Sequence, residues 1–123
     1  MIRNLTVKEN LWFYAMLRRE RNVSKTDANA MVNSVIVSMG LWKVRHSKIG
    51  DEKVRGISGG QRKRVNVAIE LMGRPSLLFL DEPTSGLDAT STNELMGNLK
   101  KLATLGLNVG ACTSSRLARL LTY

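Results

Sequence analysis

The sequence predicts an α/β fold, with helices in its first part followed by a strand–helix–strand unit of a parallel sheet. Apolar residues recur at helical spacing behind Ser, Thr or Asp residues that can cap a helix. An uninterrupted apolar run, Leu77 to Leu80, is typical of a buried parallel strand. A second apolar segment from Leu107 to about Ala111 returns after a helix, so the order strand, helix, strand predicts one βαβ crossover.

Residues 1–40 predict two helices. The first follows a capping box made by Thr6 and Glu9 and ends in a basic cluster near residue 20. Its apolar face is Val7, Leu11, Tyr14 and Leu17. Ser24 and Asp27 repeat the capping device, and Gly40 is placed to end the second helix in a left-handed turn. The apolar face of the second helix is Ala28, Val32, Val35 and Met39.

Residues 41–57 show neither helical nor strand periodicity. Gly50 and Gly56 punctuate the segment, which predicts a connecting loop with one irregular turn. His46 is the one histidine of the chain. Since no second candidate ligand stands near it, a solvated side chain is the favoured interpretation over a metal or catalytic residue.

Ser58 is predicted to cap a third helix that runs to Gly73, and Pro75 forbids its continuation. One face of this helix is lined by Gln61, Val65, Ala68, Ile69 and Met72. After the strand, Asp88 is placed to cap a fourth helix that Gly106 closes. Its stripe is Leu95, Leu99 and Leu102. Two strands do not make a doubly covered sheet, so these elements predict a piece of a larger domain.

Composition excludes some classes of protein but does not select a single one. The 123 residues suit one small domain, and a net charge of +9 with a pI near 10.3 suits nucleic acid, anionic lipid or polyphosphate. Cys112 is the only cysteine, which excludes an internal disulfide and favours a reducing compartment. The longest apolar run, Leu11 to Leu17, is too short to span a membrane, and Lys8 and Glu9 before it do not make the n-region of a signal peptide.

Two segments carry candidate chemistry. A strand ending in Asp81 delivers that carboxylate to the carboxyl edge of a parallel sheet, where it can serve Mg²⁺, while Glu82 is free to act as a general base. Ser58, Gly59 and Gly60 at a helix start predict an anion site. Taken singly, each segment is better explained without chemistry, as an ordinary cap and turn at Ser58–Gly60 and as a solvated pair at Asp81–Glu82.

The combination of segments favours the chemical interpretation. Ile57–Gln61, Leu77–Glu82 and Ser85–Asp88 resemble the signature motif, the Walker B motif and the D-loop of the nucleotide-binding domain of ATP-binding-cassette (ABC) proteins. The stretches from Gly50 through Asn66 and from Leu5 through Leu11 are similar to the G subfamily, the white-brown-complex half-transporters. The resemblance covers about Leu5 to Val109.

The resemblance implies an incomplete P-loop NTPase-type domain over residues 1–109, with a helical subdomain at about 5–57, the signature-to-D-loop region at 57–88, and a divergent tail at 110–123. It implies ATP hydrolysis coupled to export of lipids or other hydrophobic compounds. Ser58, Gly59, Gly60 and Gln61 would face the γ-phosphate of an ATP held by a second nucleotide-binding domain. Asp81 would serve Mg²⁺ and Glu82 would be the catalytic base. The D-loop residues Ser85, Gly86, Leu87 and Asp88 would belong to the nucleotide-binding set, and Asp88 would signal across the dimer.

The resemblance also implies a homodimer or heterodimer of such domains and a membrane domain, with the chain on the cytoplasmic face. No Gly is followed by Lys and no two Gly stand five apart, so the chain contains no G-x-x-x-x-G-K-[ST] phosphate loop. The Q-loop, the switch histidine and membrane helices are missing as well. We therefore expect an inactive isolated chain, soluble or unstable, and a fragment of a transporter gene product as its origin.

Two other functions remain open at this point. A non-catalytic remnant would dock on a complete cassette through its signature and D-loop without hydrolysing ATP. A nucleic-acid-binding role is suggested by the basic residues, but they are dispersed over several helices without interleaved aromatic residues. Solvated helix faces explain them better, so we expect no nucleic-acid partner.

Overall fold

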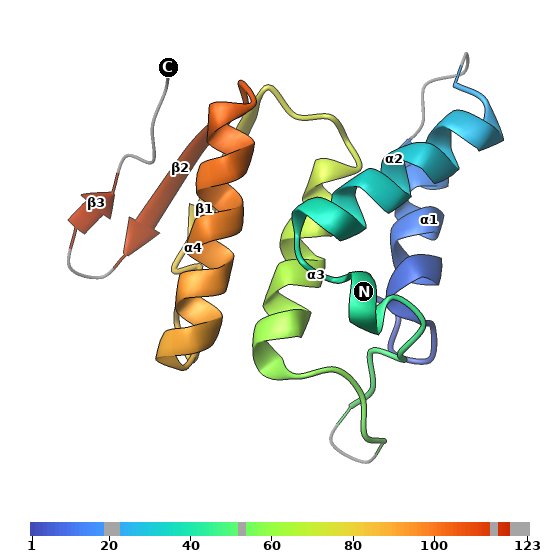
Figure 1. Ribbon diagram of the computed structural model, residues 1–123, viewed down its shortest axis with the longest axis horizontal. Coiled ribbons are helices and arrows are strands. Elements are labelled where there is room, and N and C mark those ends of the chain that lie inside the picture. Colours follow the sequence, from blue (N-terminus) through green and yellow to red (C-terminus); the bar gives the residue numbers. More distant parts are fainter. Residues whose placement is uncertain (19–22, 52–53, 114–115, 119–123) are drawn as a thin grey trace. The chain divides into compact units, whose positions relative to one another are not determined.

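The computed structural model describes residues 1–18, 23–51, 54–113 and 116–118. The chain divides into two compact units, Met1–Arg74 (unit 1) and Pro75–Tyr123 (unit 2), each with its own packing. The predicted order of helices and strands is confirmed along the chain (Figure 1).

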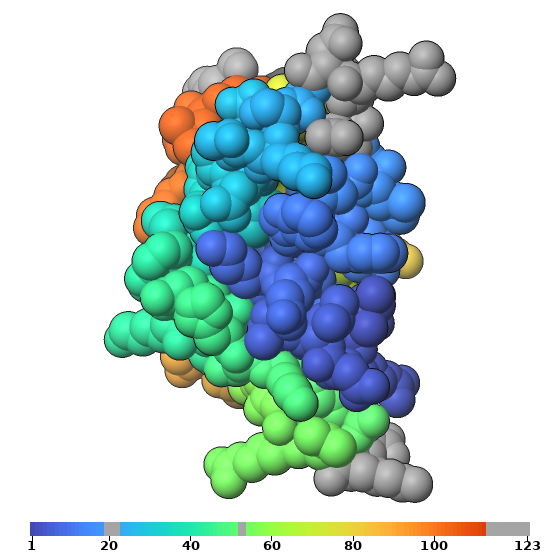
Figure 2. Space-filling model, turned by 90° about the vertical axis from the view of Figure 1, so that its right-hand side faces the viewer, coloured from blue at the N-terminus to red at the C-terminus, as the bar shows by residue number. Residues whose placement is uncertain are grey.

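Unit 1 is helical. It contains α1 (Val7–Arg18), α2 (Lys25–Ser38), the 3₁₀ turn η1 (Trp42–Val44) and α3 (Gly59–Leu71). Helix α1 packs against both α2 and α3, and α1 and α2 lie side by side on the face shown in Figure 2. The largest fully buried apolar side chains of this unit are Val7, Leu11, Val32, Ile36, Met39, Leu41, Ile49 and Val65. Among the described residues, no helix has the length and apolar character needed to cross a membrane.

The predicted helix starts in unit 1 are confirmed at the level of individual bonds. Glu9 N donates to Thr6 Oγ1 at 3.2 Å while Thr6 N donates to Glu9 Oε2 at 2.8 Å, which is a capping box. Ser24 Oγ accepts from the Asp27 amide at 3.0 Å in the same way. Gly40 has φ 65°, the left-handed conformation expected after the end of α2.

The predicted apolar face of α1 is confirmed at Val7 and Leu11 and is wrong at Leu17, which is 68% exposed. Ala15 and the polar Asn10 are buried as well. The amide of Asn10 tolerates burial because its Nδ2 donates to Ile2 O at 2.8 Å and its Oδ1 accepts from Ile2 N at 2.7 Å. Local bonding to the backbone therefore decides which side of α1 faces the core.

The loop before α3 is closed by two glycines whose backbones nearly touch. A Cβ on Gly56 would lie 2.0 Å from Ile49 O, and Gly50 has φ 74°, so neither position accepts a side chain without rearrangement. Ile57 N then donates to Lys48 O at 3.2 Å. The loop therefore closes where the backbones of the two glycines meet, a contact that we call the glycine crossing. Ser58 follows directly as the residue that caps α3.

Unit 2 is the predicted βαβ crossover. It contains β1 (Leu77–Asp81), α4 (Ala89–Thr104), β2 (Asn108–Thr113) and β3 (Arg116–Ala118). Strands β1 and β2 are parallel, with Leu78 opposite Val109 and Asp81 opposite Cys112. Leu78 and Val109 are buried, as are Leu95 and Leu99 of α4, which supply the small core of this unit.

The expectation that β1 is buried on both faces is wrong for this chain. Leu77 and Phe79 are each 62% exposed, whereas Leu78 between them is 4% exposed. Side chains alternate across a strand, so one face of β1 is covered and the other is open. Phe79 lies across Gly110 of β2, where a Cβ would meet its ring at 3.1 Å.

Strand β3 was not predicted, because residues 110–123 were expected only as a divergent tail. In the structure, β2 extends to Thr113 and β3 pairs with it antiparallel, with Ala111 opposite Ala118. The last residues expected in that tail, 119–123, lie outside the described residues.

Candidate functional site

The start of α3 is a capped helix end with two glycines in its first turn. Gln61 N donates to Ser58 Oγ at 3.2 Å and Ser58 N donates to Gln61 Oε1 at 2.9 Å, and Arg62 N donates to Ser58 O at 2.8 Å. Among the described residues, the amides of Gly59 and Gly60 have no such acceptor. Free amides at the positive end of a helix are the usual elements of an anion site.

Nothing in the described part of unit 1 explains the glycine at position 59. A Cβ built there meets no atom within 4 Å, and φ is not in the left-handed region. Gly59 is exposed, so the space that a side chain would occupy remains open. Backbone conformation does not demand this glycine, whereas close approach of a ligand or partner would.

Asp81 and Glu82 stand at the carboxyl end of β1 in unit 2. Asp81 is exposed at the edge of the parallel pair, as predicted. Glu82 has φ 44° and donates its amide to Cys112 O at 2.8 Å, so the chain turns sharply directly after the strand. The left-handed conformation of Glu82 was not predicted, and a glutamate gives no sequence signal for it.

Residues 85–88 form the turn that leads into α4. Gly86 has φ 75°, and Leu87 N donates to Thr84 O at 3.2 Å. Asp88 caps α4 as predicted, since its Oδ2 accepts from Ser91 N at 3.3 Å. The hydrogen bonds from the Ser91 side chain and backbone hold the pKa of Asp88 below its ordinary value.

The candidate residues fall in two groups. Ser58, Gly59, Gly60 and Gln61 belong to unit 1, whereas Asp81, Glu82 and the turn at 85–88 belong to unit 2. In the part of the chain that the structure describes, no three His, Cys, Asp or Glu side chains gather as a metal cage. Asp81 alone fits Mg²⁺ as one ligand, because Mg²⁺ often takes one or two carboxylates and completes its shell with water and substrate phosphates.

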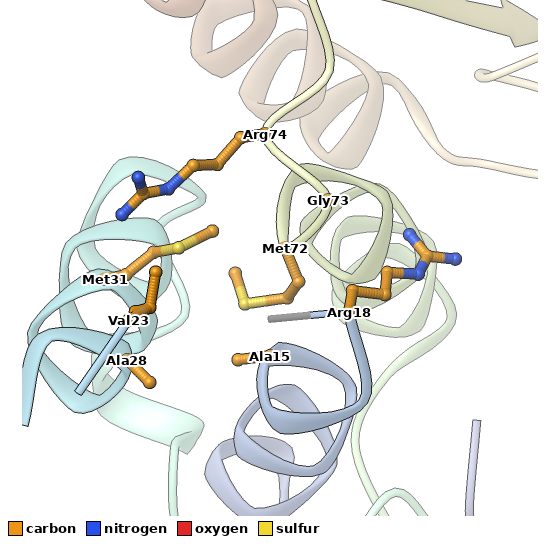
Figure 3. A pocket seen from close by; sticks show the side chains of 8 residues that line it. All are labelled: Ala15, Arg18, Val23, Ala28, Met31, Met72, Gly73 and Arg74. Carbon is orange, nitrogen blue, oxygen red and sulfur yellow. The ribbon is translucent and has the colours of Figure 1, made fainter. Parts of the chain in front are cut away.

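A cavity of about 40 Å³ in unit 1 is a poor candidate for a nucleotide site (Figure 3). Met31 and Met72 point into it, while the guanidinium group of Arg18 points away. Small-molecule sites are usually several hundred Å³, so this cavity has room for little more than water.

Comparison with known protein families shows to which family the chain belongs. The family model described as ABC transporter matches residues 1–85, which include the start of α3, strand β1 and the Asp81–Glu82 turn. The chain belongs to the ABC transporter family. Its partial P-loop NTPase-type architecture, with a helical region and a small parallel sheet, agrees with that membership.

The relatives of this ABC transporter chain are of the G type. It is 53% identical over 108 residues to ABC transporter G family member 25 of Oryza sativa subsp. japonica, covering 88% of the chain and 11% of that protein. It is 52% identical over 106 residues to ABC transporter G family member 28 of Arabidopsis thaliana, covering 86% and 10%. It is 46% identical over 105 residues to the broad substrate specificity ATP-binding cassette transporter ABCG2 of Bos taurus, covering 85% and 16%.

These figures make the chain a partial G-family nucleotide-binding domain. It spans between 10% and 16% of the length of these relatives.

Sequence reasoning missed Arg64 as a residue that supports the site. Arg64 lies within α3 and is buried, and its guanidinium bonds to the end of α2. A signal was present, because Arg64, Ala68 and Met72 share a helical spacing of four residues and Ala68 and Met72 are apolar. An arginine on an apolar face needs buried acceptors, and only the fold reveals them.

Proposed function

We propose that this chain is part of the ATP-hydrolysing domain of an exporter of lipids or other hydrophobic compounds. The partial nucleotide-binding domain would occupy residues 1–109, with the helical subdomain at about 5–57 and the signature-to-D-loop region at 57–88, and the tail would be 110–123. The observation that carries the proposal is the capped start of α3, where Gly59 is exposed, its amide has no acceptor among the described residues, and none of those residues requires a glycine there.

The proposed roles follow from this helix end and from the β1 edge. Ser58, Gly59 and Gly60, with Gln61 in the first turn, would bind the γ-phosphate of an ATP held by a second domain. The amides of the helix start and the helix dipole suit that dianionic group, since both favour negative charge. Because the sequence contains no phosphate-cradling loop, the other phosphate contacts belong to the partner.

Unit 2 would supply the metal ligand and the base. Asp81 would bind Mg²⁺ directly or through water, and Mg²⁺ when bound neutralises charge on the phosphates. Glu82, turned away from Asp81 by its left-handed backbone, would orient and deprotonate the attacking water. The turn of Ser85, Gly86, Leu87 and Asp88 would contact the opposite domain and report its state.

The partners proposed are a second nucleotide-binding domain, identical or related, and a membrane domain that holds the assembly at the cytoplasmic face. The transported compound would be chosen by that membrane domain.

A complementation assay tests the proposal. The full chain is titrated into a complete cassette whose Walker A is intact and whose own signature is disabled, and ATP hydrolysis is measured. Recovery of hydrolysis supports the proposed function. Inhibition of residual activity would support the non-catalytic docking role instead, and no effect at a saturating chain concentration would contradict both.

A further inference from the structure

Arg64 is a charged side chain buried in the interior of unit 1. It is 7% exposed, and its Nη1 donates to Met39 O at 3.3 Å and to Gly40 O at 3.5 Å. Met39 is the residue that closes α2, so the guanidinium rests on the carbonyl end of that helix. A cation at this end meets the negative pole of the helix dipole, which offsets part of the cost of its burial.

The bonds of Arg64 act near the start of α3. Residues four apart in a helix lie about one turn from each other on the same face, so Arg64 lies one turn after Gly60 on the same face of α3. The far end of the same helix is held from α1, where Arg18 Nη1 donates to Ile69 O at 3.1 Å. Helix α3 is therefore held near its middle by the bonds of Arg64 to the end of α2, and near its C-terminal end by the bond from Arg18 of α1.

A buried arginine is a poor choice for stability alone. Apolar residues of similar length usually stabilise a core as well or better, because they carry no desolvation cost. The arginine instead constrains the position of the helix, because its bonds to two successive carbonyls restrict where α3 can lie along and around its axis. That restriction applies one turn from the amides of Gly59 and Gly60.

We propose that Arg64 is a positioning residue that sets the height and rotation of the α3 start relative to α2, and so aims the Gly59 and Gly60 amides. The inference rests on the proposed function for its consequence in ATP hydrolysis. Its structural part, control of the first turn of α3 through the end of α2, stands independently of any partner.

The test compares Arg64→Met and Arg64→Lys in the full chain. Met keeps the aliphatic part of the side chain and loses the charged group, whereas Lys keeps the charge and loses the planar guanidinium. Lys25→Met, on an exposed residue at the start of α2, is the control for removing a cation. Should Arg64→Met fail to fold, Arg64→Lys carries the comparison.

The first readout is amide hydrogen exchange in the isolated chain. The Arg62 amide, bonded to Ser58 O, reports the first turn of α3, and the Asn10 amide, bonded to Thr6 O at 3.0 Å, reports α1. We expect protection at Arg62 to fall about tenfold in Arg64→Met and less in Arg64→Lys, with Asn10 unchanged, since a charged hydrogen bond is worth about that factor. An equal fall at both amides, or no fall at Arg62, would overturn the positioning role.

The second readout is the complementation assay. A displaced anion site weakens ATP binding without removing active molecules, so the KM for ATP should rise about tenfold while kcat changes little. A variant that is only less stable would lower the maximal rate at unchanged KM and so would contradict the inference. If the unmodified chain gives no complementation, the proposed function fails, and the exchange comparison alone decides whether Arg64 holds α3.

Discussion

At the scale of single residues, Ser58 combines a structural and a proposed binding task. Its hydroxyl oxygen already accepts from the Gln61 amide, as any capping serine would. Ser24 makes the same bond to the Asp27 amide at the start of α2, in a part of unit 1 that is not a candidate site. The two serines therefore form a matched pair that separates capping from phosphate binding.

We expect Ser58→Ala and Ser24→Ala to lower the free energy of unfolding by similar amounts, about 1 kcal/mol each, because each removes one helix cap. Only Ser58→Ala should also reduce complementation of a signature-defective cassette. Thermal unfolding and the hydrolysis assay measure the two effects. Equal loss of complementation in both variants would mean that Ser58 acts as a cap and nothing more.

Glu82 is the residue for which the proposed chemistry is most directly testable. Grafted with its segment into a complete cassette, Glu82→Gln should permit ATP binding and dimer closure while hydrolysis falls by about 10² to 10⁴, the usual worth of a positioned general base. Glu94→Gln, an exposed glutamate on α4, is the control. Unchanged turnover in Glu82→Gln would remove it from the role of base.

At the scale of elements, the features that could be predicted from the sequence were those set by residues close together in the chain. The starts of α1, α2, α3 and α4 depend on a capping side chain and the residue three positions on, so neighbours in sequence suffice to predict them. The left-handed glycines at the helix ends follow for the same reason.

Features that depend on distant contacts were not predictable. The exposure of Leu77 and Phe79 depends on which elements cover β1, and an apolar run does not contain that information. Strand β3 exists through its pairing with β2, and Arg64 is satisfied by carbonyls twenty-four and twenty-five residues away. The residues of the candidate site were named from sequence, but the support behind them was not.

The glycine crossing before α3 gives a prediction with a built-in contrast. Gly56→Ala places a methyl group 2.0 Å from Ile49 O and should destabilise unit 1 by about 1 to 3 kcal/mol or more, as overpacking does. Gly97→Ala in α4 meets no atom and should stabilise by about 0.5 to 1 kcal/mol through helix propensity. Chemical denaturation measures both, and equal effects would show that the crossing is not tight.

The carboxylates at two helix starts predict a dependence of stability on pH. Hydrogen bonds from the Thr6 backbone and side chain lower the pKa of Glu9 from 4.5, and those from Ser91 lower the pKa of Asp88 from 3.8. A depressed folded-state pKa gives stability that is present above the unfolded value and is lost as pH falls through the folded value.

The melting temperature should therefore fall as pH is lowered from about 6 to about 3, and the fall should be smaller in a Glu9→Gln, Asp88→Asn double variant. Each substituted side chain is a carboxamide whose oxygen can still accept the capping hydrogen bonds. Helix content near neutral pH should therefore be unchanged, and it serves as the internal control. An identical pH profile in the double variant would assign the loss to other groups.

At the scale of the whole molecule, the isolated chain should bind ATP very weakly. A capped helix end offers few amides, and the sequence has no Lys-bearing loop to hold the β- and γ-phosphates. Isothermal titration calorimetry with Mg²⁺ and ATP should give no measurable heat at concentrations that saturate a complete cassette, which serves as the control. Micromolar binding by the chain alone would contradict the division of the site between two partners.

Cys112 is a natural site for attaching a spectroscopic label to this chain. It is the only thiol in the sequence, it lies opposite Asp81 across the β1–β2 pair, and its carbonyl accepts from the Glu82 amide. A maleimide fluorophore or a nitroxide attached there would sit beside the proposed metal ligand with no other cysteine to remove. Paramagnetic Mn²⁺, used in place of Mg²⁺, would then broaden or quench that label by proximity and report directly on occupancy at Asp81.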